Sequence, residues 1–271
     1  MGDEAKPSAG APPVVEFRSV TKEFQRAGKR SVAIRDVSFA VEDVAGHGEL
    51  VSILGPSGCG KSTVLRLIAG LEPHFPATSG EVLVAGAPVT GPGADRGMVF
   101  QDYTSYPNRT VARNVEFGLE VRGMEAGERR RLALDWIEKV GLAGHESKFP
   151  HELSGGMKQR VAIARTLVMR PRIILMDEPF GALDPETRYA MQTLLVDLWR
   201  TIEATVFFVT HSITEAAYLG DRVLFMQANP GRLMGEMRLP RPDAPPEEME
   251  SRADFREVVA LLKSKVHGKT G

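Results

Sequence analysis

The chain of 271 residues contains a single cysteine, Cys59, so an intrachain disulfide is impossible and the composition favours a reducing cytosol. Its net charge is close to zero, with 34 basic and 35 acidic residues. No overall electrostatic field therefore favours binding to nucleic acid or to an anionic membrane. No apolar run approaches the ~20 residues that a membrane-spanning helix requires. The opening residues, 1–13, are acidic and rich in Pro, Ala and Gly, which predicts a disordered tail without a secretory signal.

The segment Gly55–Thr63 fits the phosphate-loop pattern G-x-x-x-x-G-K-[ST]. Glycines let the backbone approach a polyphosphate closely, and the loop's N–H groups and the following helix end attract the anion. Lys61 adds charge for the β- and γ-phosphates, and the Ser62 hydroxyl suits Mg²⁺. A strand-like run precedes the loop and a helical run follows it, as the pattern requires. The predicted nucleotide-binding residues are Gly55, Pro56, Ser57, Gly58, Cys59, Gly60, Lys61, Ser62 and Thr63, with the Cys59 side chain incidental.

Hydrophobic patterning divides the chain into three regions. Short Val-, Ile- and Leu-rich runs between glycine turns predict strands from residue 14 to about 101. Residues 102–170 show helical spacing instead, with Leu132, Trp136 and Val140 four apart, and a second helix is predicted over 157–169. Residues 173–226 return to alternating strands and helices. This alternation predicts a largely parallel, buried sheet that carries a helical insert.

Two carboxylates end the apolar strand predicted at 172–178. Adjacent strand residues face opposite ways, so Asp177 and Glu178 should not share one role. Asp177 suits the Mg²⁺ shell, and Glu178 suits polarising the water that attacks the γ-phosphate. The alternative is a charged turn at a strand end, which the preceding phosphate loop makes the weaker interpretation.

A second glycine-rich segment, Leu153–Met157, opens the helix predicted over 157–169. Such a segment at a helix start predicts a second anion site. The alternative is that Ser154 simply caps the helix. Two phosphate-type sites in one chain favour an arrangement in which each contacts a nucleotide from opposite sides.

The tail beyond Gln227 contains prolines at 230, 240, 242, 245 and 246, which predict an extended connector. Ser251–Asp254 resembles a cap that opens an amphipathic helix. One side of that helix would carry Phe255, Val259, Leu262 and Val266. Such a stripe is typical of a helix that docks on the domain's own core, and a regulatory or partner role is the alternative.

The order of these segments resembles that of the ATP-binding subunits of ABC transporters over about residues 14–227. LSGGMKQRVAIART is similar to the family signature, IILMDEP to its Walker B strand and Gly181–Asp184 to its D-loop. MVFQ places Gln101 at the Q-loop glutamine, and VFFVTHS places His211 at the switch histidine. The expected fold is an α/β P-loop NTPase of the RecA-like type: a mostly parallel sheet core, an N-terminal antiparallel β portion and an inserted helical subdomain.

The resemblance implies a head-to-tail dimer that sandwiches two ATP molecules with Mg²⁺. The phosphate loop and Glu178 of one subunit would face Ser154, Gly155 and Gly156 of the other across the γ-phosphate. Gln101 would contact Mg²⁺ and the attacking water, and His211 would hold the γ-phosphate. Asp184 would link the two active sites. Phe24 is the candidate aromatic that stacks on adenine; the alternative places this Phe, just before a strand, in the core.

Within the family, the chain is most similar to importers of nitrate, sulfonates and taurine. Three features depart from them, and one is the tail beyond Gln227, which is too generic to assign. Tyr103–Thr110 replaces a Leu-Pro-Trp-like stretch where the permease docks, and residues 42–47 are lengthened. The implied partners are permease subunits docking near Asp102–Thr110, a second copy of the chain as a homodimer, and an extracytoplasmic solute-binding protein. The implied location is peripheral, on the cytoplasmic face of the inner membrane, and the solute stays open.

Two other function classes are alternatives. A P-loop GTPase or small-molecule kinase is disfavoured because no N-K-x-D motif occurs, and the D-x-x-G at 43–46 precedes the phosphate loop. A mechanochemical ABC ATPase acting on DNA or ribosomes shares the nucleotide motifs. Such proteins usually carry coiled coils, zinc modules or tandem ATPase domains, which this chain lacks, and its balanced charge predicts no nucleic-acid partner. The domains expected are the tail at 1–13, the ATPase domain at 14–227, and the connector and helix at 228–271.

Overall fold

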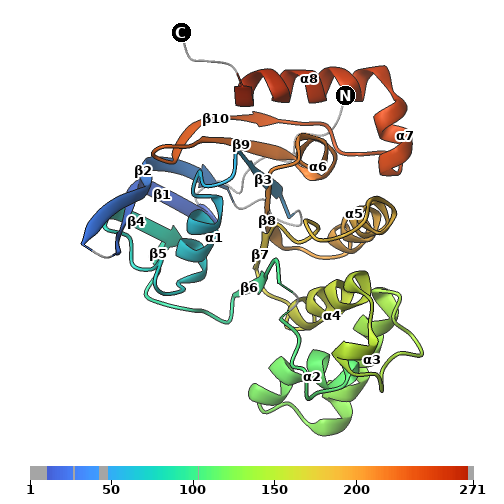
Figure 1. Cartoon of the computed structure of the whole chain (residues 1–271). Helices are drawn as coiled ribbons and strands as arrows, with labels where there is room; N and C mark the ends of the chain where they lie inside the picture. The colour runs from blue at the N-terminus through green and yellow to red at the C-terminus, as the bar shows by residue number, and fades with distance from the viewer. Residues whose placement is uncertain (1–10, 27, 43–47, 103, 268–271) are drawn as a thin grey trace.

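A computed structural model describes residues 11–26, 28–42, 48–102 and 104–267. Figure 1 shows an upper part that holds two sheets and a lower part that is helical. Most of the predicted tail at 1–13 and of the lengthened segment at 42–47 lies outside the described residues, so these two expectations stay predictions.

A six-stranded sheet forms the centre of the upper part, in the order β10-β9-β3-β8-β7-β6. Its strands β3, β6, β7, β8 and β9 pair in parallel. Strands β3, β7 and β8 are buried throughout, as expected where helices or a second sheet cover both faces. The bounds are β3 Leu50–Leu54, β6 Arg96–Val99, β7 Ile173–Asp177, β8 Thr205–Thr210, β9 Arg222–Gln227 and β10 Arg232–Arg238.

The N-terminal residues form a separate antiparallel sheet in the order β2-β1-β4-β5. Its strands are β1 Val15–Arg26, β2 Lys29–Val41, β4 Ser79–Val84 and β5 Ala87–Pro88. Helix α1, Lys61–Ala69, contacts strands of both sheets, and Val64, Leu65 and Ile68 belong to the core that joins them. The sequence therefore predicted the α/β core and its antiparallel N-terminal portion correctly.

Three α-helices and a 3₁₀ turn stand between β6 and β7 in the chain and form the lower part of Figure 1. The spacing of Trp136 and Val140 is confirmed, since both are buried. One helix, α2, was missed although Val111, Val115 and Leu119 repeat at four-residue intervals on its buried side. The elements are α2 Val111–Val121, α3 Ala126–Lys139, η1 Pro150–Glu152 and α4 Gly155–Leu167.

The tail is more ordered than an extended connector. Residues 232–238 form β10, which pairs antiparallel with β9, so the prediction of a connector is wrong there. An exposed strand edge offers unpaired N–H and C=O groups, and β10 satisfies those of β9. The register of the β9–β10 pair shifts between Leu233 and Gly235, which has a φ of 145°, so the pairing is irregular at this point.

The helices after β7 are α5 Pro185–Trp199, α6 Ile213–Leu219, α7 Pro246–Ser251 and α8 Ala253–His267. The cap predicted at Ser251 is wrong, because the Ser251 hydroxyl donates to the Glu248 carbonyl at 2.7 Å and ends α7. The stripe on α8 docks on the domain core as expected: Phe255 and Leu262 are buried, and α8 contacts α6 and β9. Within the described ranges, no helix combines the length and apolarity needed to cross a bilayer.

Candidate functional site

The phosphate loop and the three predicted catalytic residues follow four neighbouring strands of the central sheet. The order β3-β8-β7-β6 runs in parallel, so the carboxyl ends of these strands meet at one edge. The phosphate loop follows β3, His211 follows β8, Glu178 follows β7, and Gln101 follows β6. Ligands of open α/β sheets bind at this edge. Residues more than 100 positions apart in sequence thus come together.

The phosphate loop has a backbone that only glycine fits at two positions. A Cβ on Gly60, where φ is 92°, would lie 2.3 Å from Ile34 Cγ2, and one on Gly55 would lie 2.5 Å from the Met226 carbonyl oxygen. Gly58 also has a positive φ of 78°, and nothing lies within 4 Å of its Cβ position. The loop is packed behind and open in front, which is the shape a polyphosphate cradle needs.

The Lys61 ammonium group contacts the backbone of this loop. Its Nζ donates to the carbonyl oxygens of Gly55 at 2.8 Å and Pro56 at 3.2 Å, and it lies 3.7 Å from Glu178 Oε1. The side chain is only 4% exposed. This buried ammonium group is held by neutral carbonyl oxygens at the start of a helix. It therefore favours binding of an anion, because the anion supplies the negative charge that the carbonyls lack.

Ser62 and Asp177 form a compact oxygen cluster beside the loop. The Ser62 hydroxyl donates to Asp177 Oδ1 at 2.7 Å, and Arg66 Nη2 lies 3.6 Å from Oδ2. Burial raises the pKa of Asp177 above its usual value, and the Ser62 hydrogen bond opposes that shift. The described residues contain no group of three or more His, Cys, Asp or Glu side chains able to hold a metal. This donor set fits Mg²⁺, which commonly takes few protein ligands and completes its shell with phosphates and water.

Glu178 comes directly after the last residue of β7, so strand alternation does not set the direction of its side chain. Its Oε2 lies 3.1 Å from His211 Nδ1, and its backbone N–H donates to the Val209 carbonyl at 3.1 Å. Its φ is 46°, a left-handed conformation that costs a non-glycine residue about 1 kcal/mol or more. The Nε2 of Gln101 lies 3.7 Å from the Cβ position of Gly181, in the turn after Glu178. The two carboxylates therefore have different neighbours.

Phe24 lies within β1, not before a strand as the sequence suggested. The ring is half-buried, stands edge-on to His74 with centroids 5.1 Å apart, and has Lys22 Nζ 5.3 Å from its centroid. His74 Nε2 lies 3.4 Å from Arg66 Nη1, and burial lowers the pKa of His74 to about 4. A neutral His74 and Arg66 thus connect Phe24 to the Asp177 cluster.

Neither His74 nor Arg66 was predicted. Arg66 could have been found, because it stands four residues after Ser62 and so on the same face of α1. His74 carried no usable signal, since its role depends on a loop that returns to β1 only in the folded chain.

Ser154 and Asp184 each cap a helix. The Ser154 hydroxyl accepts from the Met157 N–H at 3.3 Å, and the Asp184 carboxylate accepts from the Thr187 N–H at 3.0 Å. The hydrogen bonds that Asp184 accepts from Thr187 hold the pKa of the Asp184 carboxylate below its usual value. A Cβ on Gly156 would lie 2.5 Å from Thr187 Cγ2, so this glycine permits α4 to approach α5.

Within one chain, the signature segment and the phosphate loop belong to different parts of the molecule. Figure 1 shows α4 in the lower part with α2 and α3, whereas α1 lies in the upper part. Ser154 is exposed and Gly155 is partly exposed, but Gly156 is buried. The capping role expected as the alternative for Ser154 is therefore present, and the residue is exposed.

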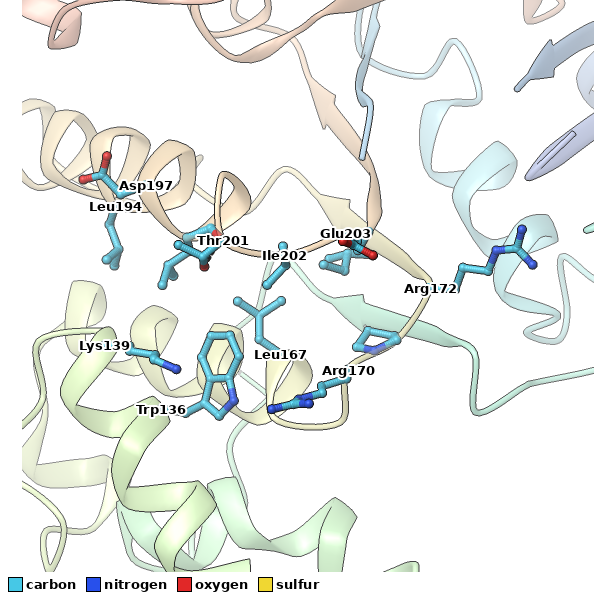
Figure 2. A pocket seen from close by; sticks show the side chains of 14 residues that line it. Trp136, Lys139, Leu167, Arg170, Arg172, Leu194, Asp197, Thr201, Ile202 and Glu203 are labelled. Atoms are coloured by element: carbon cyan, nitrogen blue, oxygen red, sulfur yellow. Dashed lines mark hydrogen bonds between the residues drawn. The ribbon is translucent and has the colours of Figure 1, made fainter. Parts of the chain in front are cut away.

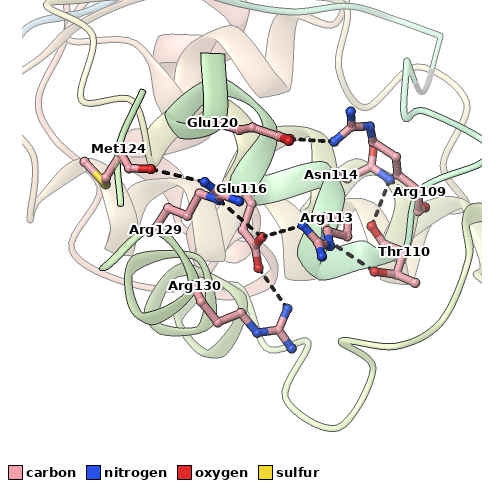
Figure 3. Close-up of polar contacts among 9 residues, drawn as sticks. All are labelled: Arg109, Thr110, Arg113, Asn114, Glu116, Glu120, Met124, Arg129 and Arg130. Atoms are coloured by element: carbon pink, nitrogen blue, oxygen red, sulfur yellow. Dashed lines mark hydrogen bonds and ion pairs between the residues drawn. The ribbon is translucent and has the colours of Figure 1, made fainter. Parts of the chain in front are cut away.

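The segment expected to meet a permease is fixed to α2 by one buried amide. Asn114 accepts from the Tyr106 N–H at 2.7 Å and donates to the carbonyls of Tyr106, Arg109 and Thr110 at 3.1, 2.9 and 3.0 Å. Figure 3 shows Asn114 beside Arg109 and Thr110. Tyr106 packs edge-on against Phe117, with ring centroids 4.6 Å apart. Tyr103 lies outside the described residues.

Behind this segment, Figure 3 shows a carboxylate surrounded by arginines. Glu116 is buried, and its oxygens lie 2.9 Å from Arg130, 3.7 Å from Arg113 and 3.9 Å from Arg129. Arg109 pairs separately with Glu120 at 2.8 Å. The pairs of Glu116 with Arg129 and Arg130 join α2 to α3, whereas Arg109 and Arg113 pair with carboxylates of α2 itself.

Comparison with known protein families agrees with this site geometry. A family model described as ABC transporter matches residues 34–181. The chain belongs to the ABC transporter family. It is an ATP-binding cassette with ATPase activity, and cassettes of this family dimerise and work with membrane permease components.

Two curated relatives and one solved structure show how far the similarity extends. The nitrate import ATP-binding protein NrtD of Synechocystis is 46% identical over 217 residues, covering 79% of each chain. The taurine import ATP-binding protein TauB of Burkholderia pseudomallei is 49% identical over 207 residues, 76% of this chain and 77% of that one. A dimeric ATP-binding cassette in a post-hydrolysis state with ADP and Pi is 34% identical, with a TM-score of 0.72 over 83% of this chain and 99% of that one.

Proposed function

We propose that this cassette hydrolyses ATP to power an importer of a small solute such as nitrate, a sulfonate or taurine. The observation that carries the proposal is the convergence of Lys61, Ser62, Asp177, Glu178 and His211 at one sheet edge. The import direction and the solute class come from the names of NrtD and TauB.

In this proposal, each group around the phosphate loop has a separate role in ATP binding or hydrolysis. Lys61 binds the β- and γ-phosphates, and so exchanges its loop carbonyls for phosphate oxygens. Ser62, Asp177 and Gln101 would hold Mg²⁺, which neutralises charge on the phosphate oxygens. Glu178 accepts a hydrogen bond from the attacking water and polarises it, and His211, 3.1 Å from Glu178 Oε2, contacts the γ-phosphate. Phe24 stacks on the adenine.

We propose that two copies join head to tail to complete each site. The accessible N-terminal end of α4, at Ser154 and Gly155, would meet the γ-phosphate bound by the other copy. Gly156 would contribute through its backbone, because its Cβ position faces Thr187 of its own chain. Asp184 opens α5 beside this end and would connect the two sites. The dimer of the related cassette, with ADP and Pi bound, supports this arrangement.

The permease would dock at Asp102–Thr110, where Asn114 holds the backbone and Tyr106 is 37% exposed. A partly exposed aromatic on a fixed loop offers contact area at a low entropic cost. Docking there would place the cassette peripherally on the cytoplasmic face of the membrane. An extracytoplasmic solute-binding protein would complete the importer.

The proposal is tested by Glu178→Gln, which keeps the shape of the side chain but removes its charge. We expect ATP binding to persist, turnover to fall by two or more orders of magnitude, and a dimer to accumulate with ATP and Mg²⁺. Phosphate release and size-exclusion chromatography measure the two effects. Glu128→Gln, at an exposed position of α3, is the matched control and should behave as the wild type. Undiminished turnover would remove Glu178 from this role.

A companion variant tests the head-to-tail arrangement. Ser154→Arg should block turnover while the isolated chain still binds ATP with unchanged affinity, because Ser154 serves the site of the other copy. Loss of ATP binding by the monomer would instead assign Ser154 to its own pocket.

A further inference from the structure

The turn that carries His211 is closed by hydrogen bonds on both sides of that residue. The Thr210 hydroxyl, just before it, accepts from the Ser212 N–H at 3.0 Å. The Ser212 hydroxyl, just after it, caps α6 by accepting from the Glu215 N–H at 3.3 Å. The His211 side chain is 57% exposed, and its Nδ1 contacts Glu178. An exposed side chain of this kind takes its direction largely from the backbone that carries it.

One buried carboxylate joins this turn to a neighbouring helix. Glu215, in α6, is only 7% exposed. Its Oε2 accepts from the Thr210 hydroxyl at 2.5 Å, and its Oε1 lies 3.6 Å from Arg188 Nε in α5. Glu215 therefore contacts both neighbours of His211: Thr210 through its side chain and Ser212 through its backbone N–H.

Arg188 extends this connection to the segment before α5. Its Nη2 donates to the Leu183 carbonyl at 3.0 Å. Its Nε is buried and has no hydrogen-bond partner among the described residues, so the charge that faces it comes from the Glu215 carboxylate. A buried ion needs a partner of opposite charge, and each of the two residues is that partner for the other. The contacts thus run from the turn at His211 to the segment Gly181–Asp184.

The same contacts favour the charged form of Glu215. Burial raises the pKa of the Glu215 carboxyl, whereas the Thr210 hydrogen bond and the Arg188 guanidinium lower it. Loss of either partner would leave a buried carboxylate oxygen with less compensation, so the turn and the helix are held together by one charged group.

The later part of α5 borders an open space. A cavity of about 940 Å³ separates it from the helical insert, and Figure 2 shows Leu194 of α5 and Ile202 beyond it facing Trp136 and Leu167 across the gap. Toward the insert, this part of the helix lacks close packing. The first turn of α5 is instead joined to α6, through Arg188.

We propose that Glu215 is a positioning residue for ATP hydrolysis. Its carboxylate holds the turn of His211 and, through Arg188, the segment Gly181–Asp184 in one fixed arrangement. The inference rests on the function proposed above, in which His211 contacts the γ-phosphate and Asp184 connects the two sites. Glu215 has no contact with the phosphate loop, so its loss slows hydrolysis and leaves ATP binding unchanged.

The pair Thr210→Val and Thr210→Ser tests the hydroxyl that links the turn to Glu215. Valine keeps the branched shape but leaves the carboxylate oxygen and the Ser212 N–H without this partner, whereas serine keeps the hydroxyl. Phosphate release by the full chain with ATP and Mg²⁺ should show kcat lowered about tenfold in Thr210→Val, with KM and the ATP dissociation constant changed by less than about twofold. Thr210→Ser should keep kcat within about threefold of the wild type.

Glu215→Ala removes both side-chain contacts and should lower kcat by at least about tenfold. Its matched control is Glu49→Ala. Glu49 is also a buried carboxylate paired with an arginine, Arg222, but it stands before β3, at the opposite end of that strand from the phosphate loop. Both variants should lose stability in urea unfolding, and at a temperature where both are folded only Glu215→Ala should lose kcat. Arg188→Gln combined with Glu215→Ala should lose less than the product of the two single losses, because both act through one connection.

Three results would overturn the inference: a wild-type kcat in Glu215→Ala, equal losses in Thr210→Val and Thr210→Ser, or the same loss of kcat in Glu49→Ala. His211→Ala separates this inference from the proposed function. Full turnover in His211→Ala would refute the proposed role of His211 and the inference with it. Lost turnover in His211→Ala beside full turnover in Glu215→Ala would refute the inference alone.

Discussion

A buried ion pair lies at the junction between the two sheets. Arg222 of β9 donates through Nε to Glu49 Oε1 at 3.1 Å and through Nη2 to Oε2 at 2.9 Å. Its Nη1 donates to the Ala40 carbonyl of β2 at 2.9 Å and lies 3.1 Å from Glu236 of β10. The side chains of Arg222 and Glu49 are 4% and 11% exposed. The guanidinium therefore links both sheets.

Arg222→Met keeps most of the side-chain volume but leaves the Glu49 carboxylate buried. Its remaining partner is the exposed Arg238, 3.3 Å away. Removing one member of a buried pair costs about 3–5 kcal/mol, because the other charge stays desolvated. At about 2–4 °C per kcal/mol for a chain of this size, we expect the melting temperature to fall by roughly 10 °C.

The double variant Glu49→Leu with Arg222→Met is the control. It removes both charges and should recover most of the loss, because an apolar pair of similar volume replaces a buried ion pair at little cost. Urea unfolding of the wild type, both single variants and the double variant gives the coupling energy. A loss below about 1 kcal/mol in Arg222→Met, or additive losses in the double variant, would refute the reasoning.

Three further outcomes are expected. Asn114→Ala removes the contacts of the amide to Tyr106, Arg109 and Thr110 and should cost about 2–3 kcal/mol and speed proteolysis at 102–110, whereas exposed Asn108→Ala should do neither. His74 has its pKa lowered from 6.5 to about 4, so the unfolded chain protonates first and stability falls as pH drops from 6.5 toward 4. His74→Gln should flatten that dependence in urea titrations, and an unchanged slope would contradict it. Cys59 is fully buried with a raised pKa, so a thiol reagent should label it only in denaturant, and rapid native labelling would show otherwise.

Local sequence patterns were sufficient to predict the phosphate loop, the strand that ends at Asp177, and the buried face of α4. Each of these depends on residues only a few positions apart. Glycine spacing, alternation along a strand and four-residue repeats along a helix all follow from backbone geometry. The family resemblance then added Gln101 and His211, which no local pattern distinguishes from surface residues.

Longer-range features required the tertiary structure. The order β3-β8-β7-β6 brings Lys61, Glu178 and His211 within contact distance. The edge strand β10 pairs antiparallel with β9, a contact that no local pattern predicted. Periodicity says which face of an element is apolar, but it does not say which two faces meet.

The chain alone thus predicted a phosphate cradle and two adjacent carboxylates after a buried strand, because these patterns are encoded over short distances. Only the folded chain decided the partners of those groups: Arg66 beside Asp177, His74 against Phe24, and Arg222 between the sheets. Each of these contacts joins residues from different elements. Their distances depend on how strands and helices stack, and that stacking results from the packing of the whole core rather than from any one segment.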